Sequence, residues 1–194
     1  MFSLAIDGPS AAGKSTLSRK IAKRLGLLYV DTGALYRAVG LRALETSTNF
    51  LDEDCIKKML INTKVDLKFK NSQPAVLLNG IDISGKIRTE KISKIASDIS
   101  AFSVVREFLL NIQKEIPKQN NVIMEGRDIS TLILPRASVK IFLTASAKQR
   151  AKRRCSELKT KNKNHAEYLK VLESIKARDH NDKNRVLSPL KLAP

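Results

Sequence analysis

The sequence contains no tryptophan, and aromatic residues make up only 5% of its 194 residues. This composition argues against a nucleic-acid surface built on base stacking, because such surfaces depend on aromatic side chains. Cysteine and histidine are also scarce, with two of each. Cys55 and Cys155 are far apart, and His165 and His180 lack metal-ligand spacing. The sequence therefore predicts neither a disulfide framework nor a zinc site.

Long apolar runs are absent too. No stretch approaches the length of a membrane-spanning helix, and Met1 and Phe2 lead directly into the first predicted strand without a signal peptide. Two isolated cysteines are typical of a reducing compartment. We therefore expect a cytoplasmic protein that does not bind membranes.

Positively charged residues are in excess. Lysine and arginine number 36 against 19 aspartates and glutamates, which gives a net charge of +17. Such an excess can indicate binding to nucleic acid or to an anionic membrane. Here the charges are scattered along predicted helices and do not form one basic arm, which favours the solvated surface of an enzyme that handles anions.

The most specific motif is GPSAAGKS, residues 8–15, which fits the phosphate-loop pattern G-x-x-x-x-G-K-[ST]. Gly8 and Gly13 let backbone N–H groups turn inward onto a polyphosphate, and the helix that follows points its positive end at the same anion. Lys14 can reach the terminal phosphates, and the Ser15 hydroxyl can bind magnesium. An apolar strand precedes the loop and an amphipathic helix follows it, so the local context predicts nucleotide binding.

Further strands are predicted at residues 27–30, 122–124 and 139–143, with helices between them at 52–61, 87–101 and 104–116. Pro117 is predicted to end the last of these helices. An alternating pattern over 65–83, with turns at Asn71–Pro74 and Asn79–Gly80, predicts a small antiparallel sheet. A polar loop at 159–164 precedes a final helix over 166–180. The pattern indicates an α/β fold with an inserted β lobe.

Polar residues follow the ends of the predicted strands, where open α/β sheets bind ligands. Thr32, Tyr36 and Arg37 follow the second strand, and Glu125 and Arg127 follow the third. Glu125 can orient a hydrated magnesium ion and Arg127 can face a phosphate. Two further groups of residues each lie on one predicted helical face. The first group is Arg150, Arg153 and Arg154, and the second is Arg178, Asp182 and Arg185. Surface arginines and exposed ion pairs remain the alternatives for each of these residues.

The motifs together resemble the bacterial cytidylate kinases, the (d)CMP kinases of the nucleoside monophosphate kinase family of P-loop kinases. The matching segments follow the family order over nearly the whole chain. They are IDGPSAAGKST, VDTGALYRAV, LLNGIDIS, GKIRTE, IASDISAFSVVRE, EGRDIS, VKIFLTAS, RAKRR and RDHNDKNR.

The resemblance implies a P-loop NTPase three-layer sandwich with sheet order 2-3-1-4-5 in a single domain. Its core is expected at about 1–62 and 86–147, an inserted β lobe at 63–85, and a helical lid with the following helix at 148–185. The implied reaction transfers the γ-phosphoryl group of ATP to CMP or dCMP with Mg²⁺. A monomer that does not bind nucleic acid is expected.

The resemblance also implies roles for individual residues. The ATP-binding residues are Gly8, Pro9, Ser10, Ala11, Ala12, Gly13, Lys14, Ser15 and Thr16. The CMP-binding residues are Thr32, Tyr36, Arg37, Ser97, Arg106, Arg127, Asp128, Arg178, Asp182 and Arg185. The catalytic residues are Lys14, Arg127, Arg150, Arg154 and Arg185, and the magnesium site is Ser15 with Glu125.

Three departures from the family pattern stand out. Thr32 replaces a common serine, Glu125 replaces a common aspartate, and the chain stops where the family continues into a fifth strand and a closing helix. We expect that absence to leave strand 139–143 with an unpaired, apolar edge.

Two other functions stay open on sequence grounds. One is a P-loop kinase with another acceptor, such as UMP, AMP or a metabolite, and the other is a basic ATP-binding module that binds nucleic acid.

Overall fold

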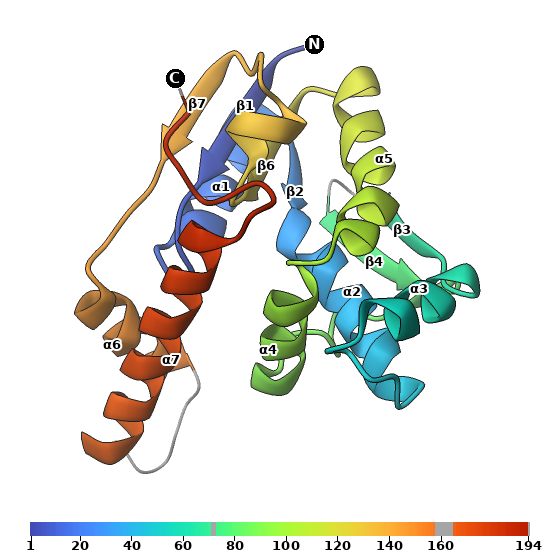
Figure 1. The fold of residues 1–194 in the computed structure, drawn as a ribbon. Coiled ribbons are helices and arrows are strands. Elements are labelled where there is room, and N and C mark those ends of the chain that lie inside the picture. The colour runs from blue at the N-terminus through green and yellow to red at the C-terminus, as the bar shows by residue number, and fades with distance from the viewer. Residues whose placement is uncertain (71–72, 158–164, 194) are drawn as a thin grey trace.

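A computed structural model of the chain describes residues 1–70, 73–157 and 165–193. Its centre is a four-stranded parallel sheet with the order β2-β6-β1-β7 (Figure 1). The strands are β1 (Ser3–Asp7), β2 (Leu28–Asp31), β6 (Val122–Gly126) and β7 (Val139–Phe142). Counted along the chain this order is 2-3-1-4, so the α/β fold class is confirmed, as are the first four strands of the expected order. All carboxyl ends meet at one edge of the sheet.

The sheet is stable because its two middle strands bury apolar side chains on both faces, as parallel strands usually do. All five residues of β1 are buried, as are Val122, Ile123 and Met124 of β6. Strand β7 is one of the two edge strands of the described sheet, and its first residue, Val139, is 40% exposed.

The inserted segment forms the predicted antiparallel sheet, with order β3-β4-β5. Its strands are β3 (Val65–Lys70), β4 (Gln73–Leu78) and β5 (Ile81–Asp82). The sheet does not stand apart, because Val65, Val76 and Leu78 share one core cluster with residues of four neighbouring helices. The turn predicted at Asn71–Pro74 falls partly on residues 71–72, which lie outside the described residues, while Gln73 and Pro74 belong to β4.

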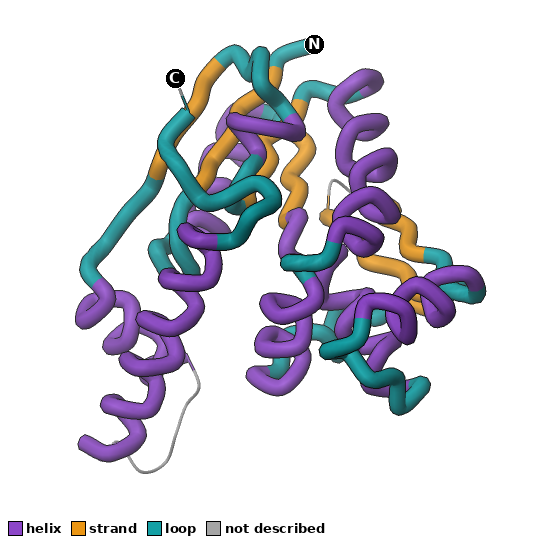
Figure 2. The backbone as a smooth tube through the Cα atoms, viewed as in Figure 1, coloured by secondary structure: helices purple, strands orange, loops and turns teal. Residues whose placement is uncertain are grey.

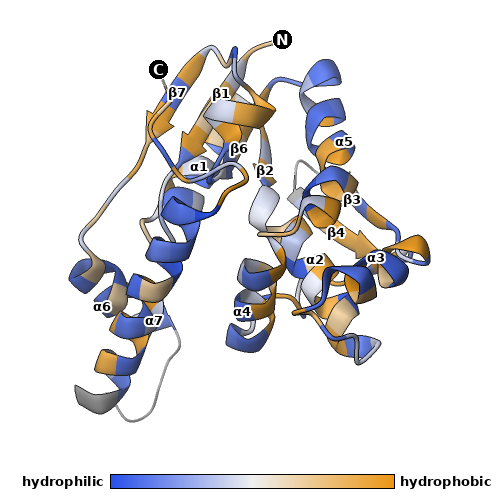
Figure 3. Cartoon of the chain, viewed as in Figure 1, coloured by the Kyte–Doolittle hydropathy of each residue, from blue (hydrophilic) through white to orange (hydrophobic). Residues whose placement is uncertain are grey.

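Helices surround the parallel sheet on both sides (Figure 2). They are α1 (Lys14–Leu25), α2 (Thr32–Glu45), α3 (Glu53–Ile61), α4 (Glu90–Ile99), α5 (Ser103–Gln119), α6 (Ala147–Glu157) and α7 (His165–Asn184), with a π-helix, η1, at Ile129–Ile133. Helices α6 and α7 lie to one side and α2 and α4 to the other, and the former pair is coloured mainly hydrophilic (Figure 3). Within the described ranges, no helix combines the length and apolarity that crossing a membrane requires.

Several predicted boundaries are wrong. Pro117 does not end its helix, because α5 continues to Gln119. Proline has no N–H, so α5 continues through this turn without the hydrogen bond from residue 117 to the carbonyl of Gln113, and the side chain of Asn120 donates to the carbonyl of Ile116 at 3.0 Å. Helix α4 is shorter than residues 87–101, and α7 is longer than 166–180. The polar loop predicted at 159–164 lies outside the described residues.

Helix α4 begins at a capping residue that gives a direct stability test. The Thr89 side chain accepts a hydrogen bond from the backbone N–H of Ile92 at 3.2 Å. Replacing Thr89 with alanine leaves that N–H without its partner, which typically costs about 1 kcal/mol. In a chain of this size we expect the melting temperature to fall by about 2–4 °C. A thermal melt measures this, and Thr89→Ser should retain the wild-type value, because serine supplies the same oxygen.

Candidate active site

A cleft of about 1470 Å³ opens at the carboxyl edge of the parallel sheet. Its walls include the phosphate loop, the N-terminal part of α2, helix α4, the loop after β6, and helices α6 and α7. Cationic side chains outnumber carboxylates along these walls. The cleft therefore suits a polyanion.

The phosphate loop joins β1 to α1 and forms the floor of the cleft. Gly8 has φ of +149°, and a Cβ atom there would lie 2.0 Å from the carbonyl oxygen of Leu143, so only glycine fits between the loop and the chain after β7. Gly13, with φ of +102°, turns the chain into the first residue of α1. Residues 10–16 all line the cleft.

Lys14 is buried beneath this loop. Its Nζ donates to the carbonyl oxygens of Gly8 at 2.7 Å and Pro9 at 2.9 Å. Burial, with the nearby charge of Arg127, lowers the pKa of Lys14 to about 7. The ammonium is thus desolvated and held inside the loop, and a phosphate group would favour its charged form.

Glu125 lies at the end of β6, opposite Ser15. The Tyr29 hydroxyl donates a short hydrogen bond to Oε1 of Glu125, and the Ser15 side chain is also hydrogen-bonded to this carboxyl. Burial raises the pKa of Glu125, and the charge of Asp31 adds to the rise. Ser15 and Glu125 both line the cleft, so this pair of oxygen ligands has the chemistry that Mg²⁺ prefers.

Helix α2 brings three of the predicted substrate residues to the cleft. Thr32 donates to the carbonyl oxygen of Glu125 at 2.8 Å, which fixes the start of α2 against β6. Arg37 forms an ion pair with Asp31 at 2.7 Å. Partial burial raises the pKa of Tyr36, and its ring lies 5.9 Å from the guanidinium carbon of Arg106.

A buried network of charges links the loop after β6 to α5 and α7. Arg106 pairs with Asp128 through a short hydrogen bond and also donates to the carbonyl of Ser100 at 3.2 Å. Nε of Arg127 donates to Asp182 at 2.7 Å. Arg185 lies 3.9 Å from both Asp128 and Asp182. The structure therefore brings together residues from positions 106 to 185 that the sequence presents in separate motifs.

Several buried guanidinium atoms around the cleft have no hydrogen-bond partner among the described residues. They are Nε of Arg37, Nε of Arg178 and Nη2 of Arg185, all on residues that line the cleft. Burial, with repulsion from Arg127, lowers the pKa of Arg178 to about 10. Buried donors without partners are costly, so they point to an anionic ligand that would satisfy them.

The three arginines of α6, which are expected to belong to a lid, have different partners. Arg150 is buried and makes a two-point contact with Asp179, at 2.9 and 2.5 Å, and also donates to the carbonyl of Ser10 at 3.2 Å. Arg153 donates to the carbonyl of Ala12 at 2.9 Å. Arg154 pairs with Glu157 at 3.3 Å and is more exposed. Arg150 thus joins α6, the phosphate loop and α7.

Sequence reasoning missed the partners that hold these residues. Asp179 follows Arg178 within RDHNDKNR, and Asp31 directly precedes Thr32, so both lie in motifs that the sequence already marked. Tyr29 lies inside the strand predicted at 27–30, and Asp7 lies within the segment IDGPSAAGKST, but neither residue was predicted to hold a site residue. Ser97, by contrast, was predicted, and it lines the cleft on α4.

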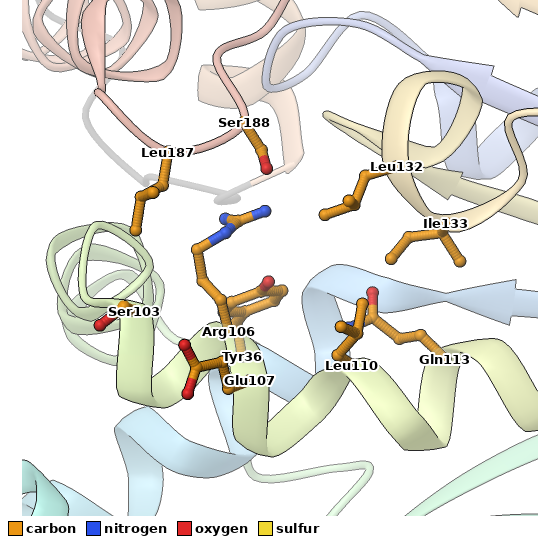
Figure 4. Close-up of a pocket in the computed structure, with 10 residues that line it drawn as sticks. All are labelled: Tyr36, Ser103, Arg106, Glu107, Leu110, Gln113, Leu132, Ile133, Leu187 and Ser188. Atoms are coloured by element: carbon orange, nitrogen blue, oxygen red, sulfur yellow. The ribbon is translucent and has the colours of Figure 1, made fainter.

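A second cavity, of about 160 Å³, shares Tyr36 and Arg106 with the cleft. Figure 4 shows these two side chains next to each other, with Leu132 and Ile133 on one side and Leu187 on the other. The segment at Leu187 and Ser188 therefore lies close to the part of the cleft that Tyr36 and Arg106 line. The Ser188 carbonyl accepts a hydrogen bond from Nε of Arg185 at 2.8 Å, so this segment also supports an arginine of the cleft.

Comparison with known proteins places the chain in a family. The sequence model of the family described as cytidylate kinase matches residues 4–194. The cytidylate kinase of Caldicellulosiruptor saccharolyticus is 48% identical over 99% of this chain and 84% of its own length. That of Fusobacterium nucleatum is 44% identical over 98% of this chain and 85% of its own length.

One relative carries the same region inside a larger protein. The bifunctional pantoate ligase/cytidylate kinase of Prochlorococcus marinus strain MIT 9312 is 43% identical over 96% of this chain and 37% of its own length. A solved structure from Thermus thermophilus aligns with a TM-score of 0.39 at 14% identity, over 95% of this chain and 85% of that chain. The family assignment rests on the sequence matches: this chain belongs to the cytidylate kinase family.

Proposed function

We propose that this chain transfers the γ-phosphoryl group of ATP to CMP or dCMP, giving ADP and CDP or dCDP. The observation that carries the proposal is the set of buried guanidinium atoms on Arg37, Arg178 and Arg185 that lack a hydrogen-bond partner among the described residues, in the same cleft as a phosphate loop. A donor polyphosphate and an acceptor phosphate would satisfy these groups together. Family membership supports the same reaction.

The donor side is built from the phosphate loop. Backbone N–H groups of residues 10–16 would hold the phosphates of ATP, with Lys14 at the γ-phosphate. Ser15 and Glu125 would hold Mg²⁺, Glu125 partly through water. Bound there, the ion would neutralise charge on the β- and γ-phosphates.

The acceptor side is built from the charge network. Thr32, Arg37, Arg127 and Arg185 would bind the phosphate of CMP, so that its oxygen can approach the γ-phosphorus with reduced repulsion. Arg178 and Asp182 would hold the sugar, with Tyr36 packed nearby. Ser97, Arg106 and Asp128 would bind the cytosine edge. Asp128 can accept from the 4-amino group of cytosine, whereas uracil presents an oxygen at that position.

Phosphoryl transfer needs positioning and charge stabilisation more than covalent chemistry from the protein. The Arg154 side chain is more exposed than that of Arg150, so it would be free to reorient toward the transferring group. Arg150 is already held by Asp179, so its contribution would be to anchor the lid on the phosphate loop. A closed lid would also exclude water, which would otherwise hydrolyse ATP.

The proposal is tested by measuring ADP release from ATP and Mg²⁺ with CMP, dCMP, UMP or AMP as acceptor, with a reaction lacking acceptor as the background. We expect CMP and dCMP to exceed UMP and AMP in kcat/KM by at least about tenfold, because a mismatched base leaves buried polar groups unpaired. Chromatography of the products should show CDP or dCDP. Equal rates with UMP or AMP would reassign the acceptor. Tight binding of duplex DNA at physiological salt without any turnover would favour the nucleic-acid module instead.

A further inference from the structure

Asp7 is a fully buried carboxylate immediately before the phosphate loop, and none of the roles proposed above uses it. It is the last residue of β1 and has no exposed surface. Its Oδ1 accepts the backbone N–H of Ile129 at 2.9 Å, and its Oδ2 accepts the backbone N–H of Ser130 at 2.8 Å. The Ser130 hydroxyl donates a further, short hydrogen bond to Oδ2. Three donors therefore converge on a carboxylate from a segment more than a hundred residues away.

The segment that Asp7 holds carries the acceptor residues. Ile129 and Ser130 directly follow Arg127 and Asp128. The backbone carbonyl of Asp128 accepts from Leu132 at 2.9 Å, so the position of η1 also determines the position of Asp128. Through Arg127 and Asp128 this segment reaches Asp182 on α7 and Arg106 on α5.

The phosphate loop, in contrast, does not depend on the Asp7 side chain. The backbone of Asp7 is paired with Gly126 of β6 and Phe142 of β7, and its carbonyl accepts from the N–H of Leu143 at 2.8 Å. Strand β1 thus lies between two neighbours that fix its end, as Figure 1 shows. The geometry separates two roles, because the backbone of Asp7 supports the donor loop and its carboxylate supports the acceptor segment.

We propose that Asp7 is a positioning residue for the acceptor nucleotide. Its carboxylate holds the segment of Arg127 and Asp128 in a fixed place relative to the phosphate loop, and so sets the affinity for CMP without setting the affinity for ATP. This inference rests on the proposed cytidylate kinase function. It adds to that function a residue that touches neither nucleotide.

The test replaces Asp7 with asparagine, which keeps the side-chain size. One oxygen becomes an NH₂ group, which cannot accept a hydrogen bond from a backbone N–H. We expect the Kd and KM for CMP to rise about tenfold, the effect of losing one hydrogen bond to a charged group. The Kd for a non-hydrolysable ATP analogue and the KM for ATP should stay within about twofold, because the sheet still holds the loop. Calorimetric titration with each nucleotide and initial rates give these values.

Two further variants separate positioning from general destabilisation. Ile56→Ala removes a fully buried side chain of α3, in a core cluster that contains neither Asp7 nor η1, and should lower the melting temperature while leaving both nucleotide affinities unchanged. Ser130→Ala removes one of the three donors to Asp7 and should weaken CMP binding by about threefold, with ATP binding unchanged. A merely structural role for Asp7 would make Asp7→Asn behave like Ile56→Ala.

The inference is overturned if Asp7→Asn weakens ATP and CMP binding equally, or if it lowers the melting temperature and changes neither affinity. If Asp7→Asn does not fold, the CMP affinity of Ser130→Ala tests the inference instead. An unchanged CMP affinity in that variant rejects the inference. Wild-type protein is measured alongside. Failure of the wild type to bind or phosphorylate CMP would reject the proposed function itself, whereas normal wild-type turnover with no selective CMP defect in the variants would reject only the role of Asp7.

Discussion

Replacing Lys14 with methionine is expected to lower kcat about a thousandfold, which corresponds to about 4 kcal/mol of transition-state stabilisation. Methionine retains most of the side-chain volume and removes the charge. The ammonium of Lys14 is held inside the phosphate loop by the carbonyls of Gly8 and Pro9, where water screens it little. It is thus held where, under the proposed function, it would stabilise charge on the transferring phosphoryl group. Initial rates with saturating ATP and CMP measure the loss.

The same substitution should change stability little. Two hydrogen bonds to loop carbonyls are lost, but a buried ammonium that burial disfavours is removed as well, so we expect the melting temperature to shift by only a few degrees. Lys23→Met is the matched control, since Lys23 lies on the exposed side of the same helix α1 and undergoes the same change of charge. A Lys14→Met enzyme with more than a tenth of wild-type kcat would contradict the role given to this residue.

The fold was predictable where local sequence patterns determine it. The phosphate loop could be recognised because its glycines, lysine and hydroxyl have fixed spacing, and the buried strands because their apolar runs are short and continuous. The inserted sheet showed its period of two and its Asn79–Gly80 turn. Pro117 was misjudged because a proline near a helix end resembles a stop signal, whereas α5 continues two residues past it although proline supplies no N–H to the helix.

The partners inside the site were not predictable, because they are long-range contacts between polar residues. Asp7 and Ile129 are 122 positions apart, and Arg150 and Asp179 are 29 apart. A helical face with three arginines predicts a cationic surface, but only the packing of α6 on α7 shows that Arg150 is buried and Arg154 is not. Which arginine binds a carboxylate and which is left without a partner depends on tertiary structure.

Removing the charge of Asp182 is expected to have the largest effect on stability. This carboxylate is 5% exposed, accepts from Arg127 at 2.7 Å and lies 3.9 Å from Arg185. In Asp182→Asn these guanidiniums and Arg178 would repel one another in a buried site. Breaking a buried ion pair from one side costs about 3–5 kcal/mol, and we expect a loss in this range in the free energy of unfolding by urea.

The pH dependence of that loss identifies its cause. Burial by itself would raise the pKa of Asp182, but the charges of Arg127 and Arg178 outweigh it and leave the pKa below its usual value. A lowered folded-state pKa means that the stabilisation is complete above the ordinary carboxyl pKa of about 4 and is lost as the pH falls through the lowered value. The difference between wild type and Asp182→Asn should therefore stay constant between about pH 5 and 8 and shrink below about pH 4.

Glu115→Gln is the control for a charge whose loss should matter little. Glu115 pairs with Lys118 at 2.6 Å, but both side chains are mostly exposed, so the free energy of unfolding should change by less than about 1 kcal/mol. An Asp182→Asn protein as stable as Glu115→Gln would mean that the arginines find other partners and that the network does not hold α7 in place. If the large loss is observed, the same carboxylate that would bind the acceptor sugar also fastens α7 to the loop after β6. Stability and CMP binding would then be lost together, because α7 carries Arg178 and leads directly into Arg185.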